Sequence, residues 1–307
     1  MTQSQSAFVR SYAQINLTES AQVWDEQGEV RTLSIACERA LTLYLNKREI
    51  VTLMTLGAEP EALVLGYLRN QGMITGLDKV VAIQVDWEVE SAVVVAAHDP
   101  KLEEKLQHKT VTTGCGQGTQ YGALMADLDQ VNLTLFTVRQ RAIYQLLSVL
   151  NEHNETYRSA GAVHGCALCT LPIASEAQAQ VLAFSEDVGR HNAVDTLAGK
   201  QWLNNLFVEE MVFYTTGRLT SEMVIKVARM GISVLLSRSG VTEMGLKLAQ
   251  KLGIMLIARA KGRHFLIYSE QERFIWDEKP SLKPNGAKVA AALEVTQRAN
   301  AGREAPA

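Results

Sequence analysis

Between residues 181 and 258, short apolar runs alternate regularly with segments that have helical spacing of apolar residues. This alternation is typical of strands joined by helices, and it constrains the fold more than any other feature of the chain. The last five elements are expected at 211–214, 222–230, 232–236, 243–252 and 254–258. Gly231 and Gly253 follow the two helices, where a left-handed turn ends a helix. The pattern predicts a βαβαβ unit.

The loops that follow these three strands are the first candidate site. Right-handed crossovers make the strands parallel, so the loops after Tyr214, Leu236 and Ala258 are expected at one edge of the sheet. Open α/β sheets bind ligands at that edge. The loops are made largely of small or polar residues with Arg or Lys, and two of them open helices whose free N–H groups suit phosphate. We therefore expect a ligand that carries phosphate groups.

The first half of the chain has a different pattern, which predicts a smaller α+β domain at residues 31–110. Five strands are expected there, at 32–36, 41–46, 51–55, 80–85 and 92–97. Pro60, with acidic neighbours, opens a helix between the third and fourth strands. Residues 1–30 are expected to form a flexible lead-in and residues 279–307 a flexible tail. The predicted fold class is α/β, with the larger domain at 131–278.

Composition limits the function classes. The chain has 307 residues, of which 47% are hydrophobic and 21% charged, as in an ordinary globular protein with a sizeable core. The net charge of −3 gives no basic surface that would indicate a nucleic-acid partner. No apolar run fits a signal peptide or a membrane span, so a cytoplasmic protein is expected. The 4 cysteines are too few for a disulfide scaffold, which leaves chemistry, metal binding or burial as their use.

Cys115 is the candidate nucleophile. It lies between Gly114 and Gly116 in segment 112–118, where no large side chain close in sequence shields it. A thiol becomes a working nucleophile when a cation or a helix N-terminus lowers its pKa, and the arginine-bearing loops offer cations. Burial as a small apolar residue is the alternative, but a segment this rich in glycine makes a poor core element.

A second thiol-bearing segment contains His164, Cys166 and Cys169. These residues have the ligand types and the tight spacing of a zinc site, and the two cysteines also fit a redox Cys-x-x-Cys pair. Structural zinc sites usually combine two separated pairs, however, and this segment is apolar and rich in alanine. Burial of small residues beside the site is therefore the third interpretation.

Residues 186–195 concentrate acids, an arginine and His191 at the junction of a strand and a helix. Such density at a junction favours a functional site. The alternatives are structural: Asp187 as a helix cap and Asp195 on a solvated face of the helix.

Several strings together resemble the formate dehydrogenase accessory sulfurtransferase family, FdhD, over roughly residues 41–269. They lie at 41–46, 67–74, 113–116, 163–164, 186–193, 216–223 and 261–263. The string Glu-Asp-Val-Gly-Arg-His-Asn-Ala at 186–193 is highly specific. The resemblance implies a three-layer, cytidine-deaminase-like α/β fold for the larger domain, and a homodimer.

The resemblance also implies an activity. Such a protein takes sulfur from a cysteine desulfurase as a cysteine persulfide and hands it to a bis-molybdopterin guanine dinucleotide cofactor of molybdenum or tungsten. That cofactor is destined for the catalytic subunit of formate dehydrogenase. By this resemblance the persulfide forms on Cys115, in an active-cysteine loop at 111–130 between the two domains. We assign no metal ligands.

The cofactor-binding stretch of the family falls on Arg259, Ala260, Lys261, Gly262, Arg263 and His264. Two further loops are expected to hold the phosphate groups of the cofactor. They are the loop after Tyr214, with Gly217, Arg218 and Ser221, and the loop at 238–242. His164 and His191 are candidates for polar positioning or proton transfer near the metal of the cofactor.

The chain departs from the family pattern at two positions. The second cysteine of the family's Cys-x-x-Cys loop is Gly118 here, so Cys115 cannot form a disulfide with that neighbour. A persulfide on Cys115 alone is sound chemistry, because the terminal sulfur leaves to an acceptor. Cys166 or Cys169 would replace the missing thiol if that segment lies against the loop. Lys261, where an arginine is frequent, keeps the charge but loses the planar fork for phosphate.

Two other function classes stay open. A zinc protein on the same scaffold would use His164, Cys166 and Cys169, with Cys115 as a fourth ligand, although the His-x-Glu and Pro-Cys-x-x-Cys strings of zinc deaminases are missing. A non-catalytic chaperone would hold the dinucleotide cofactor and dock on the dehydrogenase. In that case Gly118 marks the loss of sulfur transfer.

Overall fold

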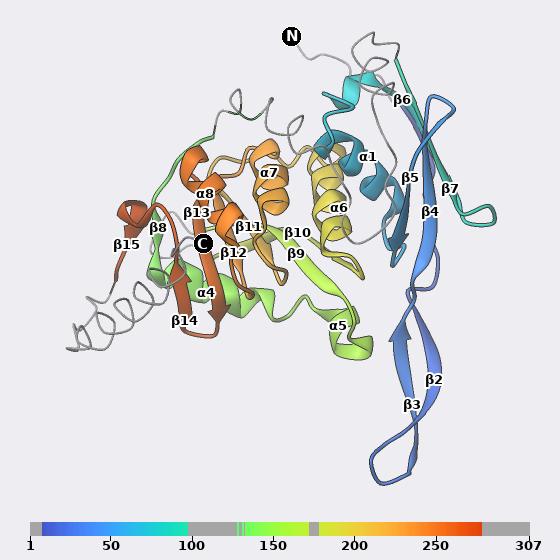
Figure 1. Ribbon diagram of the computed structural model, residues 1–307, viewed down its shortest axis with the longest axis horizontal. Coiled ribbons are helices and arrows are strands. Elements are labelled where there is room, and N and C mark those ends of the chain that lie inside the picture. The colour runs from blue at the N-terminus through green and yellow to red at the C-terminus, as the bar shows by residue number, and fades with distance from the viewer. Residues whose placement is uncertain (1–7, 98–127, 129–130, 132, 172–177, 278–307) are drawn as a thin grey trace, which may run out of the picture.

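The computed structural model describes residues 8–97, 128, 131, 133–171 and 178–277 (Figure 1). The larger unit is built on a six-stranded sheet in the order β10-β9-β11-β12-β13-β14. Its strands are β9 (His164–Thr170), β10 (Gln180–Asp187), β11 (Met211–Thr215), β12 (Val234–Ser237), β13 (Met255–Lys261) and β14 (His264–Ile267). β11, β12 and β13 are parallel, whereas β9 runs antiparallel to both of its neighbours. The βαβαβ unit expected from the sequence is confirmed.

Helices cover both faces of this sheet (Figure 1). α6 (Arg190–Leu203), α7 (Ser221–Arg229) and α8 (Glu243–Leu252) pack on one face, and α4 (Gln140–Leu150) packs on the other. Because side chains alternate along a strand, Phe213 joins the core under α7 while its neighbour Val212 joins the core over α4. The short helix α5 (Glu155–Ala160) follows α4. The mixed α/β class is therefore confirmed.

The smaller unit is a five-stranded sheet in the order β1-β6-β7-β4-β5. Its strands are β1 (Val9–Arg10), β4 (Arg39–Leu45), β5 (Arg48–Thr55), β6 (Val80–Asp86) and β7 (Ser91–Ala96), and the 3-10 turn η1 (Leu77–Lys79) precedes β6. α1 (Pro60–Asn70) covers one face and begins at the proline that the sequence analysis placed there. Four of the expected strands match β4, β5, β6 and β7.

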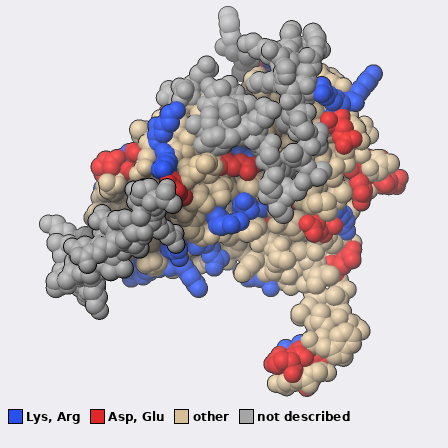
Figure 2. Space-filling view, viewed as in Figure 1, with Lys and Arg blue, Asp and Glu red and all other residues tan. Residues whose placement is uncertain are grey.

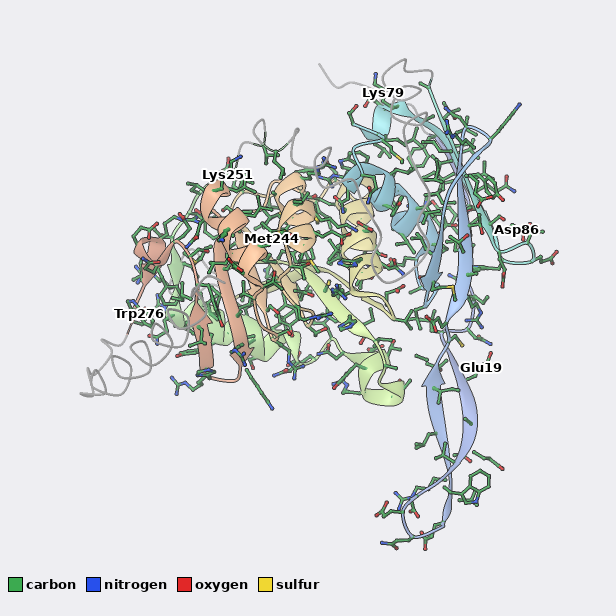
Figure 3. All side chains as sticks on the ribbon, viewed as in Figure 1. Glu19, Lys79, Asp86, Met244, Lys251 and Trp276 are labelled. Atoms are coloured by element: carbon green, nitrogen blue, oxygen red, sulfur yellow. The ribbon has the colours of Figure 1, made fainter. Side chains whose placement is uncertain are left out.

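A hairpin of β2 (Thr18–Trp24) and β3 (Val30–Ala36) projects from the smaller unit (Figures 1 and 3). The fifth expected strand, 32–36, lies within β3. β1 and β2 fall within residues 1–30, where the sequence analysis expected a flexible lead-in. These residues gave little strand signal because polar side chains dominate β2 and most of the hairpin is exposed. A last pair of short strands joins β8 (Val138–Arg139) to β15 (Phe274–Ile275), which follows the 3-10 turn η3 (Gln271–Arg273).

The two units meet where α1 crosses α6. A Cβ at Gly66 of α1 would overlap the carbonyl oxygen of Asp195, and a Cβ at Gly199 of α6 would overlap that of Ala62. The two glycines therefore allow the helix backbones to touch. Arg69 of α1, which is buried, donates to the carbonyl oxygen of Ala198 at 2.9 Å. This contact fixes the position of α1 against the larger unit.

Two segments differ from the sequence expectations. The segment at 164–170 is a central strand, β9, in which every residue from Gly165 to Cys169 is buried. It gave no alternating pattern because both of its faces are covered. The stretch 259–264, expected as a loop, is instead the end of β13, a two-residue turn and the start of β14. Within the described ranges, none of the helices is long and apolar enough to span a membrane.

Candidate functional site

The carboxyl ends of β10, β11, β12 and β13 lie at one edge of the large sheet, together with the start of β9. α6, α7 and α8 begin at this edge, each after one of those strands. The hydroxyl oxygens of Thr220 and Thr242 cap α7 and α8 by accepting from the backbone N–H groups of Met223 and Gly245. The first turns keep further N–H groups that suit an anion. The edge that the sequence predicted therefore exists.

Hydrogen bonds hold the loop after β11 in place. The N–H of Gly217 donates to Thr215 Oγ1 at 3.0 Å, and its carbonyl oxygen accepts from Ser237 Oγ at 2.6 Å. A Cβ at Gly217 would lie 3.1 Å from Cδ of Arg190, so the arginine side chain packs directly over the glycine. Arg218, the next residue, is exposed. The loop thus presents an exposed cation beside a tightly packed backbone.

His164 starts β9 next to this loop. Its Nδ1 atom lies 3.4 Å from Thr216 Oγ1. Burial lowers the pKa of His164, and the cations Arg190 and Arg218 lower it further. The ring is consequently neutral at pH 7, with one nitrogen that can donate and one that can accept.

His191 lies in the first turn of α6. Its Nε2 atom is 3.3 Å from Glu222 Oε2 at the start of α7. Burial lowers the pKa of His191 to about 3, and the largest electrostatic contribution comes from Lys226. His164 contributes to the same shift, so the two rings lie within electrostatic reach of each other. Both candidate histidines thus belong to one cluster.

Asp187 ends β10 and connects the cluster with the smaller unit. Its carboxylate accepts from the Thr55 hydroxyl, from the Leu56 N–H at 3.1 Å, from the Gly189 N–H at 2.8 Å and from Asn192 Nδ2 at 3.0 Å. Burial raises its pKa, and these hydrogen bonds oppose the rise. Gly189, and not Asp187, occupies the N-cap position of α6. The interpretation of Asp187 as a simple cap is therefore wrong.

Asp195 does not lie on a solvated face, which the sequence analysis had offered as an alternative. It is buried in the middle of α6, and Lys226 Nζ of α7 lies 2.8 Å from its Oδ2 atom. The alternative failed because the face of α6 that carries Asp195 is covered by α1 and α7.

The stretch 259–264 extends the edge along β13 and β14. Arg259 has a left-handed backbone (φ 52°) at an irregularity of the β13–β14 pairing, and its N–H donates to the Ser239 carbonyl oxygen at 2.9 Å. A non-glycine residue at positive φ at such a place is typical of functional sites. Ala260 is buried, so its side chain faces the core rather than the edge. Arg263 lies over the ring of Tyr144, 5.2 Å from its centre.

The edge is rich in exposed cations. Figure 2 shows Lys and Arg gathered along the lower rim of the larger unit, where β12 and β13 end in Figure 1. The exposed cations contributed by the loops and by the β13–β14 turn are Arg218, Arg238, Arg259, Lys261 and Arg263. The expected residues Gly217, Arg218, Ser221 and, apart from Ala260, 259–264 thus share one edge with His164 and His191. This arrangement can hold several phosphate groups.

Cys166 and Cys169 do not form a common site. Cys166 joins the core under α6 and α7, whereas Cys169 joins the core over α4, so the two thiols lie on opposite faces of β9. Burial raises the pKa of Cys166 to about 12 and also raises the pKa of Cys169. The two thiols therefore fit neither a shared zinc ion nor a disulfide between them. Among the described residues, no cluster of metal-ligating side chains is found. Cys115 lies outside the described residues.

The sequence analysis missed three residues of the cluster: Asn70, Glu222 and Lys226. Glu222 and Lys226 stand four residues apart in a helix whose other inward positions are apolar, which is a detectable signal. For Asn70 the signal was only its place in one of the family-like strings.

These features define a class: a mixed α/β protein whose parallel strands end at a cationic, helix-capped edge suited to a phosphorylated ligand. The chain belongs to the FdhD/NarQ family, whose pattern it matches over residues 36–275.

Relatives named sulfur carrier protein FdhD are similar over most of the chain. The protein of Listeria innocua is 29% identical over 247 residues, which cover 78% of this chain and 91% of the relative. The protein of Bacillus subtilis is 29% identical over 263 residues, covering 84% and 97%. A crystal structure from Desulfotalea psychrophila, provisionally described as a formate dehydrogenase accessory protein, superposes with a TM-score of 0.64 at 25% identity and covers 84% of this chain and 98% of its own.

Proposed function

We propose that this protein is a cytoplasmic sulfurtransferase that carries sulfur as a persulfide on Cys115 and delivers it for the maturation of formate dehydrogenase. Membership of the FdhD/NarQ family is the observation that carries the proposal. The names of the relatives, sulfur carrier protein and formate dehydrogenase accessory protein, support both halves of it.

The first step is an exchange between two sulfur centres. The Cys115 thiolate attacks the outer sulfur of a persulfide on a cysteine desulfurase, and a new S–S bond forms on Cys115. The old S–S bond breaks, and the desulfurase cysteine leaves as a thiolate. Because the outer sulfur of Cys115 then passes to an acceptor, Gly118 in place of a second loop cysteine does not block the cycle.

The acceptor in this proposal is a bis-molybdopterin guanine dinucleotide of molybdenum or tungsten, bound as a substrate. The chemistry of the edge supports this ligand. Exposed guanidinium groups of Arg218, Arg238 and Arg259 and the N-termini of α7 and α8 suit diphosphate groups. His164 and His191, both neutral at pH 7, would orient polar atoms of the ligand or move a proton.

Three further points belong to the proposal. We expect the formate dehydrogenase catalytic subunit and a cysteine desulfurase as partners, and a homodimer as the assembly. We also expect the cytidine-deaminase-like topology for the larger unit, which the antiparallel strand β9 between β10 and β11 supports.

A genetic test addresses the whole function. The gene is expressed in a bacterium that lacks its own FdhD, and formate dehydrogenase activity is measured in extracts. The wild-type chain and the control Cys37→Ala should restore activity, whereas Cys115→Ala should not. Restoration by Cys115→Ala would support instead the non-catalytic chaperone, which the Gly118 departure favours.

A further inference from the structure

A run of buried and half-buried polar side chains leads from the candidate site to the smaller unit. Glu222 Oε2 lies 3.3 Å from His191 Nε2, and Glu222 Oε1 lies 3.5 Å from Lys226 Nζ. Lys226 Nζ also lies 2.8 Å from Asp195 Oδ2, whose partner oxygen accepts from Asn70 Nδ2 at 2.7 Å. Three helices, α7, α6 and α1, thus contribute to one chain of contacts.

Stability alone does not explain this run. Lys226 is 2% exposed and Asp195 is 1% exposed, so both charges have lost their water. A buried ion pair of this kind is often no more stable than apolar residues of the same volume, because desolvation offsets the attraction between the charges. We therefore consider a second role for these residues, which is to fix the positions of neighbouring side chains, as buried polar networks do in some proteins.

Lys226 places a buried cation beside the carboxylate of Glu222. Burial lowers the pKa of Lys226, but the carboxylates of Asp195 and Glu222 outweigh this effect and hold that pKa above its usual value. The ammonium group is therefore charged at pH 7. One oxygen of Glu222 faces this cation, which leaves the other oxygen toward His191.

His191 needs a partner at Nε2. This atom is buried, and it makes no well-aligned hydrogen bond with a described residue. Glu222 Oε2, at 3.3 Å, is close enough to accept its proton after a small rotation of either side chain. Contacts of this kind in ligand-free sites are often loose and tighten when the ligand binds.

We propose that Glu222, held by Lys226, is a positioning residue that fixes the His191 ring as the neutral tautomer with its proton on Nε2. The lone pair of the ring is then on Nδ1, which can accept a hydrogen bond or a proton from the ligand. Asp195 and Asn70 connect this arrangement to α1. The inference depends on the proposed function only for the identity of the ligand.

The test is an NMR experiment on the full chain without any ligand. Long-range proton–nitrogen spectra of protein labelled with nitrogen-15 in its 6 histidines distinguish a protonated ring nitrogen from a bare one. The His191 signals are assigned by their loss in His191→Asn. At pH 7 we expect a neutral ring with the proton on Nε2. A charged ring, or a proton on Nδ1, would overturn the inference.

Variants of Glu222 test whether this residue sets the tautomer of His191. Glu222→Met keeps the volume but removes the acceptor, and the ratio of the Nε2–H to the Nδ1–H tautomer should fall about tenfold, as expected when a hydrogen bond to a charged group is lost. Glu243→Met is the matched control, because Glu243 and Lys247 form the same four-residue pair on α8, exposed to solvent. An unchanged ratio in Glu222→Met would contradict the positioning role.

If Glu222→Met does not fold, Glu222→Ala decides, because it also removes the acceptor and adds no side chain that could clash. A reduced ratio supports the inference, and an unchanged ratio overturns it. The spectra do not depend on sulfur transfer. A failure of Cys115 to take up sulfur would refute the proposed function and leave the inference about the tautomer standing. A wrong tautomer of His191 would refute the inference and leave sulfur transfer by Cys115 standing.

Discussion

At the scale of single residues, the candidate site combines two kinds of nitrogen group. Exposed guanidinium groups at Arg218, Arg238 and Arg259 are permanently charged and face solvent. The imidazoles of His164 and His191 are held neutral by burial and by nearby cations, of which Arg190 and Arg218 act on both rings. The first kind can attract a polyanion, and the second can exchange hydrogen bonds or protons with it.

The neutral state of His191 makes stability depend on pH. The groups that face its ring are Glu222, Lys226, Arg190, Arg218 and His164. The pKa is about 3 in the folded protein and near 6.5 when the chain is unfolded, so the unfolded state binds more protons between these values. The free energy of unfolding should therefore fall as the pH drops from 6.5 towards 3, by up to about 1.4 kcal/mol per pH unit from this residue.

His191→Asn should make that dependence shallower, as urea unfolding at several pH values would reveal. His264→Asn, an exposed histidine at the same edge, is the control and should keep the wild-type slope. Equal slopes in wild type and His191→Asn would contradict the neutral, buried ring.

Arg259 offers a second prediction at this scale. Its positive φ favours glycine, so Arg259→Gly should remove the cation without straining the backbone. We expect about tenfold weaker binding of guanosine diphosphate, measured by calorimetry, since one charged hydrogen bond contributes about 1.5 kcal/mol or more. Lys79→Ala is the control, because Lys79 lies far from the end of β13 (Figure 3). Unchanged affinity in Arg259→Gly would remove this residue from the site.

At the scale of elements, the crossing of α1 and α6 holds the site together. α6 carries His191 at its start and Asp195 one turn later, and α1 contacts this helix backbone to backbone at Gly66 and Gly199. Asp187, just before α6, is bound to Thr55 and Leu56 of the smaller unit. A shift of α1 would therefore move both the start of α6 and the buried polar run.

Gly66→Ala should test this crossing. The new Cβ would meet the Asp195 carbonyl oxygen, which belongs to a helix backbone and cannot move away freely. We expect a loss of about 3 kcal/mol in the free energy of unfolding, measured in urea. Gly240→Ala, with only the end of the Arg259 side chain within 4 Å, should change that free energy by less than about 0.5 kcal/mol. An unchanged free energy of unfolding in Gly66→Ala would show that α1 and α6 are not packed as described.

At the scale of the whole molecule, two sheets share one helical interface, and the candidate site lies on the larger unit beside it (Figure 1). Thr55 and Leu56 of the smaller unit donate hydrogen bonds to Asp187, and Asn70 donates one to Asp195. Both aspartates lie next to the candidate site or in the polar run behind it. This arrangement explains why the family match, residues 36–275, includes both units. The smaller unit is therefore part of the functional protein.

The sequence predicted the elements whose patterns are local. The glycines after α7 and α8 and the proline at the start of α1 marked these helices. The shared edge of the three loops followed from the predicted parallel order of the strands. β9 was missed because a strand buried on both faces has no alternation. Asp195 and Lys226 could not be paired from sequence, since their contact depends on how α6 packs against α7. From sequence, both cysteines of β9 were candidates for a shared zinc or redox site. The structure places them on opposite faces of the strand, which the spacing alone did not reveal.

The most direct test of the central claim is mass spectrometry of the protein after incubation with a cysteine desulfurase and cysteine. Intact mass gives the number of sulfur atoms gained, and peptide mapping gives the thiol that holds them. We predict one additional sulfur on the Cys115 peptide, and none on Cys166 or Cys169, whose thiols are buried. Sulfur on either of these cysteines, or none anywhere with an active donor, would contradict the account.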